Sequence, residues 1–247
     1  MIISATIITL NEEDKIGDAI GSLKELADEV IVVDSGSSDQ TVKIAEKLGA
    51  KVYVRKFDTF ANQKNWAMSK TKGDWILSLD ADEIVSAELA EEIKETVKSD
   101  QYAAYLIPRR NFILGKEIKH SRWSPDIHIW LWKKECGQWV GDVHEEVLVK
   151  GKIGQLKRSK IHYSHETVSE FIDANNQYSA LEANFLFDQK KHFSARNMFW
   201  DVAFEFFIRF IYKKGFLDGL KGFILAYLMG IYKLAVWIKL WELEKSK

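Results

Sequence analysis

Cysteine and proline are scarce in this chain of 247 residues, which contains one cysteine, Cys136, and two prolines. A single cysteine excludes an internal disulfide framework and any four-thiolate zinc site, and it is typical of a reducing compartment. With few prolines and no low-complexity tract, the chain does not have the composition of a disordered protein. Because 47% of its residues are hydrophobic, it can bury a sizeable core. Residues 1–4 enter a strand pattern without a preceding basic region, so we expect no secretory signal.

Charge is unevenly distributed along the chain. Residues 1–188 carry 24 Lys and Arg against 31 Asp and Glu, whereas residues 189–247 carry 11 against 5. The acidic first part argues against nucleic-acid binding. The basic, aromatic-rich end indicates an anionic membrane surface as partner; the alternative is a helical subdomain with solvated lysines.

Strand and helix patterns alternate through the first hundred residues. Strands are expected over residues 2–9, 30–33, 51–54 and 75–79, and helices over residues 12–26, 41–48, 62–69 and 86–98. This order predicts an α/β fold, with a parallel sheet covered by helices on both faces. From residue 102 the pattern changes to the shorter strands of a mixed sheet, over residues 103–109, 128–133 and 146–149. Helices are then expected over residues 167–187 and 193–241.

Two acids, Asp80 and Asp82, follow the apolar strand pattern of residues 75–79 directly. In an open α/β sheet, ligands bind at the carboxyl ends of the strands. The carboxylates would therefore lie at the mouth of a site, where they can hold a divalent cation against a phosphate. The other interpretation is helix capping, which commonly places acids after strands.

Asp34 ends the second expected strand and is followed by Ser-Gly-Ser-Ser-Asp-Gln-Thr. Helix capping and a glycine turn explain Asp39 and Thr41. They do not explain Asp34, because an unpaired carboxylate on a buried strand is costly. A nucleobase N–H would satisfy it. The segment has neither the G-x-G-x-x-G spacing of dinucleotide folds nor the GK[ST] of a P-loop.

Together these segments resemble the signatures of family 2 inverting glycosyltransferases with the GT-A fold. The matching segments are Thr9–Glu12, Val32–Thr41, Phe60–Asn65 and Leu79–Glu83. Three later segments are similar to lipopolysaccharide-core β-glucosyltransferases that act on inner-core heptose, namely His128–Trp132, Trp139–Glu145 and Gly215–Phe223. Trp130 departs from that subgroup, which usually has arginine before the leucine.

The resemblance implies a single GT-A nucleotide-sugar- and acceptor-binding catalytic domain over residues 1–188, with a central, mostly parallel mixed sheet. It assigns Asp34 to uracil, Thr9 and Glu12 to the uridine pocket, Lys64 to the nucleotide, Asp80 to the ribose and Asp82 to the metal. The metal, Mg²⁺ or Mn²⁺, would bridge both phosphates of the donor and neutralise the leaving group.

Inversion at the sugar carbon needs one general base for the acceptor hydroxyl. The subgroup's His-Glu position makes Glu145 the preferred base, with Asp142 and Glu146 as alternatives. Glu146 can also simply start a strand and face solvent. His162 is either a further ligand of the metal or diphosphate or a hydrogen-bonded core residue, and we favour the core residue.

The last segment, residues 189–247, is expected to form amphipathic, membrane-associating helices. Asp201, Glu205, Arg209 and Lys213 make one narrow polar stripe on an otherwise apolar helix, which must be buried in protein or lipid. Residues 222–232 are uncharged but too few to span a bilayer, so an interfacial helix pair is preferred to a transmembrane helix. Lys213, Lys214, Lys221 and Lys233 would face anionic lipid, and Tyr227, Tyr232, Trp237 and Trp241 would suit the headgroup boundary.

The resulting functional hypothesis is a metal-dependent inverting hexosyltransferase, cytoplasmic and peripheral on the inner face of the cell membrane. Its donor would be UDP-glucose, and its acceptor a lipid-linked saccharide such as the lipopolysaccharide inner core. Two alternatives remain open: transfer to a polyprenyl phosphate or another cell-surface glycan, and a non-catalytic nucleotide-binding scaffold.

Overall fold

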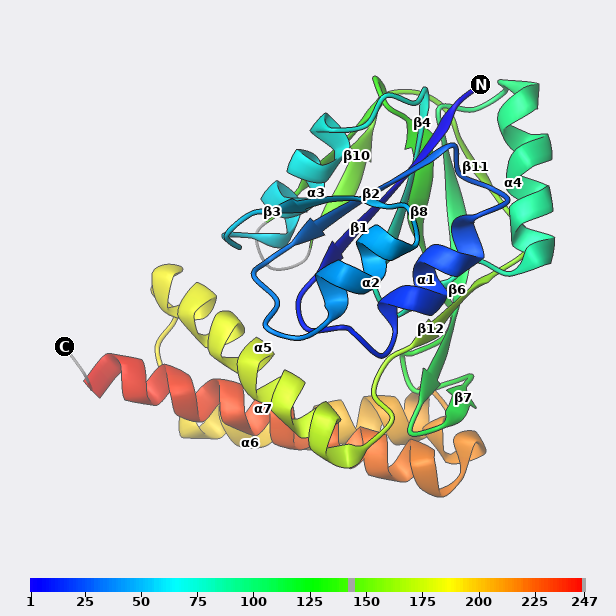
Figure 1. The fold of residues 1–247 in the computed structure, drawn as a ribbon. Coiled ribbons are helices and arrows are strands. Elements are labelled where there is room, and N and C mark those ends of the chain that lie inside the picture. The colour runs from blue at the N-terminus through cyan, green and yellow to red at the C-terminus, as the bar shows by residue number, and fades with distance from the viewer. Residues whose placement is uncertain (142–144, 246–247) are drawn as a thin grey trace. The chain divides into compact units, whose positions relative to one another are not determined.

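The computed structural model describes residues 1–141 and 145–245 (Figure 1). The chain forms two compact units, one of residues 1–109 and 127–162, and one of residues 110–126 and 163–247. The boundary expected after residue 188 falls inside the second unit, between two of its helices. A functional division at that point remains a prediction.

Four parallel strands form one half of the central sheet in the first unit, in the order β3-β2-β1-β4. They are β1 (Ile3–Thr9), β2 (Glu29–Asp34), β3 (Lys51–Val54) and β4 (Trp75–Asp80). The helices that alternate with them are α1 (Ile16–Leu23), α2 (Thr41–Lys47), α3 (Phe60–Ser69) and α4 (Ala87–Ser99). The alternation predicted from the sequence is confirmed.

Helices cover this sheet on both faces, as β2 shows. Val32 packs in the main core with Ile16 of α1, whereas its neighbours Ile31 and Val33 pack with Ala67 of α3. Successive strand residues point to opposite faces, so α1 and α3 lie on opposite sides of the sheet. Burial on both faces explains why these strands are almost continuously apolar.

The other half of the sheet is mixed, because β8 (Asp126–Lys133) runs antiparallel to β4. Beyond β8 follow β6 (Ala104–Ile113), β12 (Lys160–Tyr163) and β5 (Glu83–Ile84). Shorter strands are β7 (Lys116–Ile118) and β11 (Ile153–Gln155), which pair with β6, and β9 (Gly137–Val140) and β10 (Glu146–Val149), which pair with each other. The α/β class with a mostly parallel mixed sheet is confirmed. The sequence did not indicate β5, β7, β9, β11 or β12, because strands of two to four residues seldom show a clear alternating pattern.

The first helix is shorter than the expected range of residues 12–26. Asn11 has a φ of 54°, and its backbone N–H donates to Ser37 Oγ at 2.8 Å. The N–H of Glu12 donates to Thr41 Oγ1 at 2.8 Å. These bonds hold the segment after β1 to the segment after β2 as a loop, so α1 begins only at Ile16.

The second unit contains α5 (Val168–Asp188), α6 (Ala195–Phe207) and α7 (Leu220–Lys245), with α7 lying between the other two (Figure 1). Thr167 caps α5 by accepting from Glu170 N–H at 3.2 Å, as expected. Among the described residues, α7 alone is long and apolar enough to cross a membrane, and a third of its most apolar stretch is buried.

The helical end expected over residues 193–241 is interrupted between α6 and α7. A π-helical turn (Ile208–Tyr212) and a 3-10 helix (Gly215–Asp218) separate the two helices. A Cβ on Gly222 would lie 2.0 Å from the carbonyl oxygen of Gly215, so the chain can cross itself here only with glycine. Asp218 fixes this turn by accepting from the N–H groups of Lys119 and His120 at 3.2 and 3.0 Å.

Candidate active site

The candidate donor residues meet at the carboxyl ends of β1, β2 and β4. Thr9 pairs in register with Asp34, and Ile8 pairs with Asp80. Because these strands are parallel and adjacent, the three side chains predicted to bind the nucleotide end at one edge of the sheet. Backbone register alone brings together residues up to 71 positions apart.

Asp34 is buried but not unpaired, which corrects the expectation that the turn after its strand does not explain it. Its Oδ2 accepts from the N–H groups of Gly36 and Ser37, both at 2.8 Å, and its Oδ1 accepts from Ser37 Oγ at 2.5 Å. Gly36 takes a φ of 102° in this turn. Asp34 therefore shapes the turn, and its contact with uracil remains a prediction.

Thr9 offers a more direct indication of a ligand. Its side chain is buried, and its Oγ1 has no hydrogen-bond partner within the described part of the chain. A buried hydroxyl left in this state is costly, and a bound polar group would satisfy it. This observation fits the assignment of Thr9 to the uridine pocket.

Glu12 is a predicted site residue whose carboxyl group is perturbed by its surroundings. Burial, together with the charge of Asp82, raises the pKa of Glu12 to about 7. The segments after β1 and β4 thus bring the carboxyl groups of Glu12 and Asp82 close together. A bound cation would offset their negative charge.

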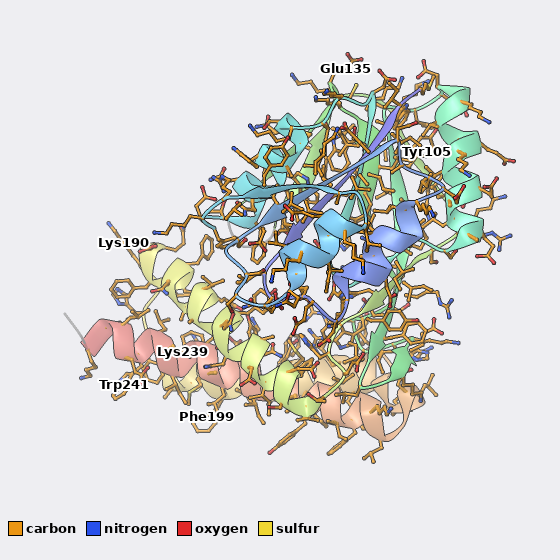
Figure 2. All side chains as sticks on the ribbon, viewed as in Figure 1. Tyr105, Glu135, Lys190, Phe199, Lys239 and Trp241 are labelled. Carbon is orange, nitrogen blue, oxygen red and sulfur yellow. The ribbon has the colours of Figure 1, made fainter. Side chains whose placement is uncertain are left out.

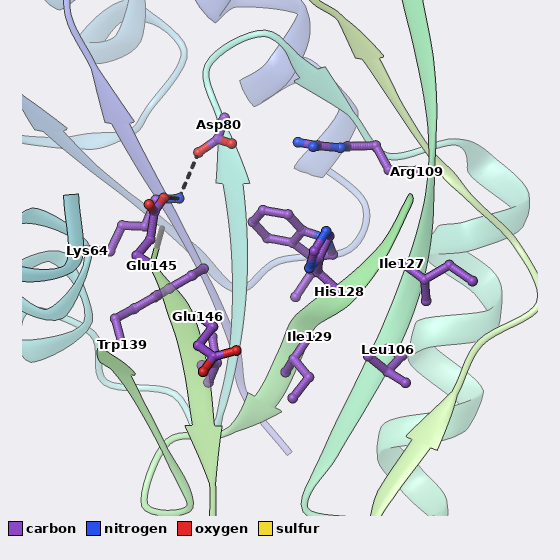
Figure 3. Close-up of a pocket in the computed structure, with 12 residues that line it drawn as sticks. Lys64, Asp80, Leu106, Arg109, Ile127, His128, Ile129, Trp139, Glu145 and Glu146 are labelled. Atoms are coloured by element: carbon purple, nitrogen blue, oxygen red, sulfur yellow. Dashed lines mark hydrogen bonds and ion pairs between the residues drawn. The ribbon is translucent and has the colours of Figure 1, made fainter. Parts of the chain in front are cut away.

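Lys64 of α3 joins the donor side of the site to the proposed base (Figure 3). Its buried Nζ lies 3.2 Å from Asp80 Oδ1 and 3.0 Å from Glu145 Oε1. Burial by itself would lower the pKa of Lys64, but these two carboxylates raise it above its ordinary value. Burial would raise the pKa of Asp80, yet Lys64, Lys160 and Arg109 hold it well below its usual range. Both ions therefore stay charged at neutral pH.

Trp139 of β9 fixes the position of Lys64. The Lys64 Nζ lies 4.5 Å from the centroid of the Trp139 ring. Asn65 anchors the same strand, because its side chain donates to Trp139 O at 2.8 Å and accepts from Trp139 N–H at 3.0 Å. The segments Phe60–Asn65 and Trp139–Glu145, both singled out in the sequence, are thus in direct contact.

A pocket of about 400 Å³ opens beside this ion-pair chain (Figure 3). Its lining combines both charges with aromatic and aliphatic side chains, namely Lys64, Asp80, Leu106, Arg109, Ile127, His128, Ile129, Trp130, Trp139, Glu145, Glu146 and Val147. Glu145 is half-buried, whereas Glu146 begins β10 and is exposed. The alternative base Asp142 lies outside the described residues.

Asp82 and His162 form the candidate metal site. The antiparallel pairing of β12 with β5 brings His162 Nε2 to 3.1 Å from Asp82 Oδ2. No cluster of three or more His, Cys, Asp or Glu that could hold a metal exists within residues 1–141 and 145–245. One carboxylate, one imidazole and the negative potential at Glu12 fit a divalent cation whose other ligands are diphosphate oxygens. His162 is thus the hydrogen-bond partner of Asp82, and its role as a metal ligand stays a prediction.

Sequence reasoning missed a buried ion cluster beneath Asp80. Glu83 is fully buried and binds Lys160 Nζ, Arg109 Nη1 at 3.0 Å and the backbone N–H of Asp80 at 3.0 Å. Burial lowers the pKa of Lys160 to about 8, and its Nζ lies 3.1 Å from the Trp130 ring centroid. Glu83 stands in the quoted Asp-x-Asp-Glu segment, but no sequence pattern distinguishes Lys160 from a surface lysine.

Comparison with known proteins identifies the family of the chain. Residues 4–152 match the family described as glycosyl transferase family 2. The chain therefore belongs to glycosyl transferase family 2, and its α/β sheet is of the predicted GT-A type.

Two relatives align over almost the whole chain. An uncharacterized glycosyltransferase of Rickettsia conorii is 34% identical over 99% of this chain and 90% of its own length. The lipopolysaccharide core biosynthesis glycosyltransferase LpsC of Rhizobium meliloti is 28% identical over 99% of this chain and 94% of its own length.

Two solved structures show weaker similarity. The crystal structure of S. aureus TarS residues 1–349 in complex with UDP-GlcNAc has a TM-score of 0.49 and 17% identity, and the match covers 95% of this chain and 82% of that one. Glucosyl-3-phosphoglycerate synthase of Mycobacterium tuberculosis, in complex with Mn²⁺ and UDP, has a TM-score of 0.38 and 26% identity. That match covers 44% of each chain.

Proposed function

We propose that the protein transfers a hexose with inversion from a uridine diphosphate sugar, UDP-glucose, to a lipid-linked saccharide such as the lipopolysaccharide inner core. The observation that carries this proposal is the bridge from Asp80 through Lys64 to Glu145 at the edge of an open pocket. This bridge connects Asp80, on the donor side of the site, to Glu145, the proposed base. The 28% identical core-biosynthesis relative supports the class of acceptor.

The donor would lie across the carboxyl ends of β1, β2 and β4. Thr9, Glu12 and Asp34 would contact the uridine, Lys64 would approach the nucleotide, and Asp80 would contact the ribose. Asp82, with His162 beside it, would hold Mg²⁺ or Mn²⁺ against the diphosphate. The bound cation would neutralise the charge that develops on the departing UDP.

Glu145 would act as the general base on the acceptor. An acceptor hydroxyl oxygen attacks the anomeric carbon while the bond from that carbon to the UDP oxygen breaks, and the hydroxyl proton passes to the Glu145 carboxylate. One displacement of this kind inverts the configuration. Lys64 would be a positioning residue here, because its contact at 3.0 Å holds the carboxylate at the pocket.

The pocket suits a saccharide acceptor. The buried rings of Trp130 and Trp139 form part of its wall, and Arg109 and His128 offer polar groups for hydroxyls or a phosphate. An acceptor of this kind is anchored in a membrane, so we place the enzyme at the cytoplasmic face as a peripheral protein. Arg109 could also bind a polyprenyl phosphate, which remains the alternative acceptor.

A donor and acceptor panel tests the proposal. Purified protein with Mn²⁺ would be given UDP- and GDP-sugars together with either lipopolysaccharide truncated at the inner core or a polyprenyl phosphate. We expect a product from UDP-glucose and the truncated lipopolysaccharide, with a β linkage in its NMR spectrum. A product only with polyprenyl phosphate would support the alternative acceptor. Metal-dependent UDP binding without turnover of any donor would indicate a non-catalytic scaffold.

A further inference from the structure

The outer side of α7 is apolar from Leu220 to Trp241, although its inner side is already buried. Leu225, Met229 and Trp237 face the interior of the second unit. On the other side, exposed apolar residues recur at spacings of three, four or seven and so share one face of the helix: Leu220, Phe223, Tyr227, Ile231, Ile238 and Trp241. Burial against α5 and α6 thus accounts for only part of the apolar surface of α7.

The neighbouring helix α6 and the π-helical turn that follows it carry a second stripe of the same kind. Trp200, Phe204, Phe207 and Ile211 are spaced by four, three and four residues, and all are exposed. Phe199 lies beside them and is 71% exposed. Figure 2 shows Phe199 and Trp241 pointing outward from the helices of this unit.

Ring contacts join the two stripes into one surface. Phe223 of α7 meets Phe206 and Phe210 at centroid distances of 5.8 and 5.5 Å. The helices also approach closely at Gly230, where an added Cβ would lie 3.5 Å from Val202 O. We call the exposed apolar residues of α6, of the π-helical turn after it and of α7 the aromatic face; they are Phe199, Trp200, Phe204, Phe207, Ile211, Leu220, Phe223, Tyr227, Ile231, Ile238 and Trp241.

The acidic residues of α6 and of the turn before α7 are paired within the second unit, whereas Glu242 near the end of α7 is exposed. Asp201 accepts from Trp237 Nε1 at 2.9 Å. Glu205 is buried with Arg209 and Arg122, and Asp218 is buried at the turn between the helices. In contrast, Lys213 and Lys214 are exposed at that turn. Near the turn between α6 and α7, the surface offered to a partner is therefore apolar and positively charged.

We infer that the aromatic face is the surface by which the protein inserts into the interfacial region of an anionic lipid bilayer. Aromatic rings flanked by lysines favour the boundary between headgroups and acyl chains. The helices would lie in the plane of the membrane, because α7 already packs against α5 and α6 along its inner side. The inference rests on the proposed function only in that a lipid-linked acceptor requires the enzyme at a membrane.

The test compares two pairs of exposed aromatic residues in vesicle flotation. The first variant, Phe204→Ser with Tyr227→Ser, removes one ring from each helix of the aromatic face; both rings are 58% exposed. The matched control, Tyr178→Ser with Phe185→Ser, removes a tyrosine and a phenylalanine from α5 that are 47% and 44% exposed. Each protein would be mixed with phosphatidylglycerol–phosphatidylethanolamine vesicles at low and high salt.

We expect the first variant to bind vesicles at least about tenfold more weakly at both salt concentrations, because the lost contacts are apolar. The control variant should bind like the parent, and both should keep the parent's melting temperature within a few degrees. Slow hydrolysis of UDP-glucose without an acceptor should be unchanged, so loss of membrane binding is separated from loss of catalysis.

Three results would overturn the inference. The first is vesicle binding by the variant on α6 and α7 that equals the parent's. The second is a parent protein that stays monomeric without detergent and ignores anionic vesicles at low salt, which would mean that the face packs against protein. The third is resistance of cell-membrane-bound parent to alkaline carbonate, which would mean that α7 spans the bilayer.

Discussion

Lys64 and Glu145 lie 81 positions apart in the sequence, and their side chains form an ion pair of 3.0 Å. Lys64 comes from α3, which packs on β1 and β2, whereas Glu145 directly precedes β10. The same lysine contacts Asp80, so a single buried cation links the donor side of the site to the acceptor side. Its loss would affect both sides at once.

Replacing Glu145 by Gln should separate the base from its neighbours. Glutamine keeps the size of the side chain but cannot accept a proton, so transfer should fall by roughly 10²–10⁴, the usual effect of losing a general base. UDP binding, measured by calorimetry, should change little. Glu146→Gln is the control, since Glu146 is exposed, and it should keep activity within tenfold of the parent. If Glu146→Gln is inactive and Glu145→Gln is active, the base is Glu146.

Asp82→Asn should nearly abolish transfer and leave the protein folded. Asparagine removes a charge from the proposed metal site, so Mn²⁺ and UDP should both bind more weakly when titrated together. His162→Asn should weaken Mn²⁺ binding less if the ring only positions Asp82, and to a similar degree if it is a ligand. An Asp82→Asn enzyme that turns over within tenfold of the parent and still requires metal would exclude a metal-binding role for Asp82.

The edge of the sheet at which the donor residues meet could be predicted from the sequence, because it depends on backbone register. Once parallel strands are recognised, Thr9, Asp34 and Asp80 must end at the same edge of the sheet. The partners of Asp34 were not predictable, because they depend on how the turn through Ser37 folds. The Glu83–Lys160 contact was also missed, since it depends on the pairing of a two-residue strand with a four-residue strand.

Glu12 should release a proton when a cation binds. Its pKa of about 7 leaves it about half protonated at neutral pH, and a nearby cation favours the carboxylate and lowers that pKa. Binding of Mn²⁺ with UDP should therefore strengthen as the pH rises through about 7. Calorimetry at pH 7 in buffers of different ionisation enthalpy measures the released protons. Glu12→Gln should release fewer; equal release from both proteins would show that Glu12 does not sense the metal.

Glu83→Gln should destabilise the protein by about 3–5 kcal/mol, because it leaves the buried Lys160 without its anion. Chemical denaturation measures this loss. Adding Lys160→Met also removes the buried positive charge that has lost its partner, so the double variant should regain part of the stability. If the two changes were simply additive, Glu83 and Lys160 would not be energetically coupled.

The four lysines that the sequence predicts to face anionic lipid should differ in their contributions to membrane binding. Lys221 donates to Leu114 O at 2.5 Å and Lys233 pairs with Glu182 at 2.7 Å, so both hold the unit together. Lys213 and Lys214 are exposed at the turn between α6 and α7.

Changing Lys213 and Lys214 to Glu should lower binding to anionic vesicles about thirtyfold or more at low salt, since each lysine contributes about 1 kcal/mol at such a surface. The effect should shrink at high salt, because salt screens exposed charges, and the melting temperature should stay constant. Lys221→Glu should instead lower the melting temperature. Equal vesicle binding by the parent and the Lys213–Lys214 variant at low salt would show that these lysines do not face the lipid.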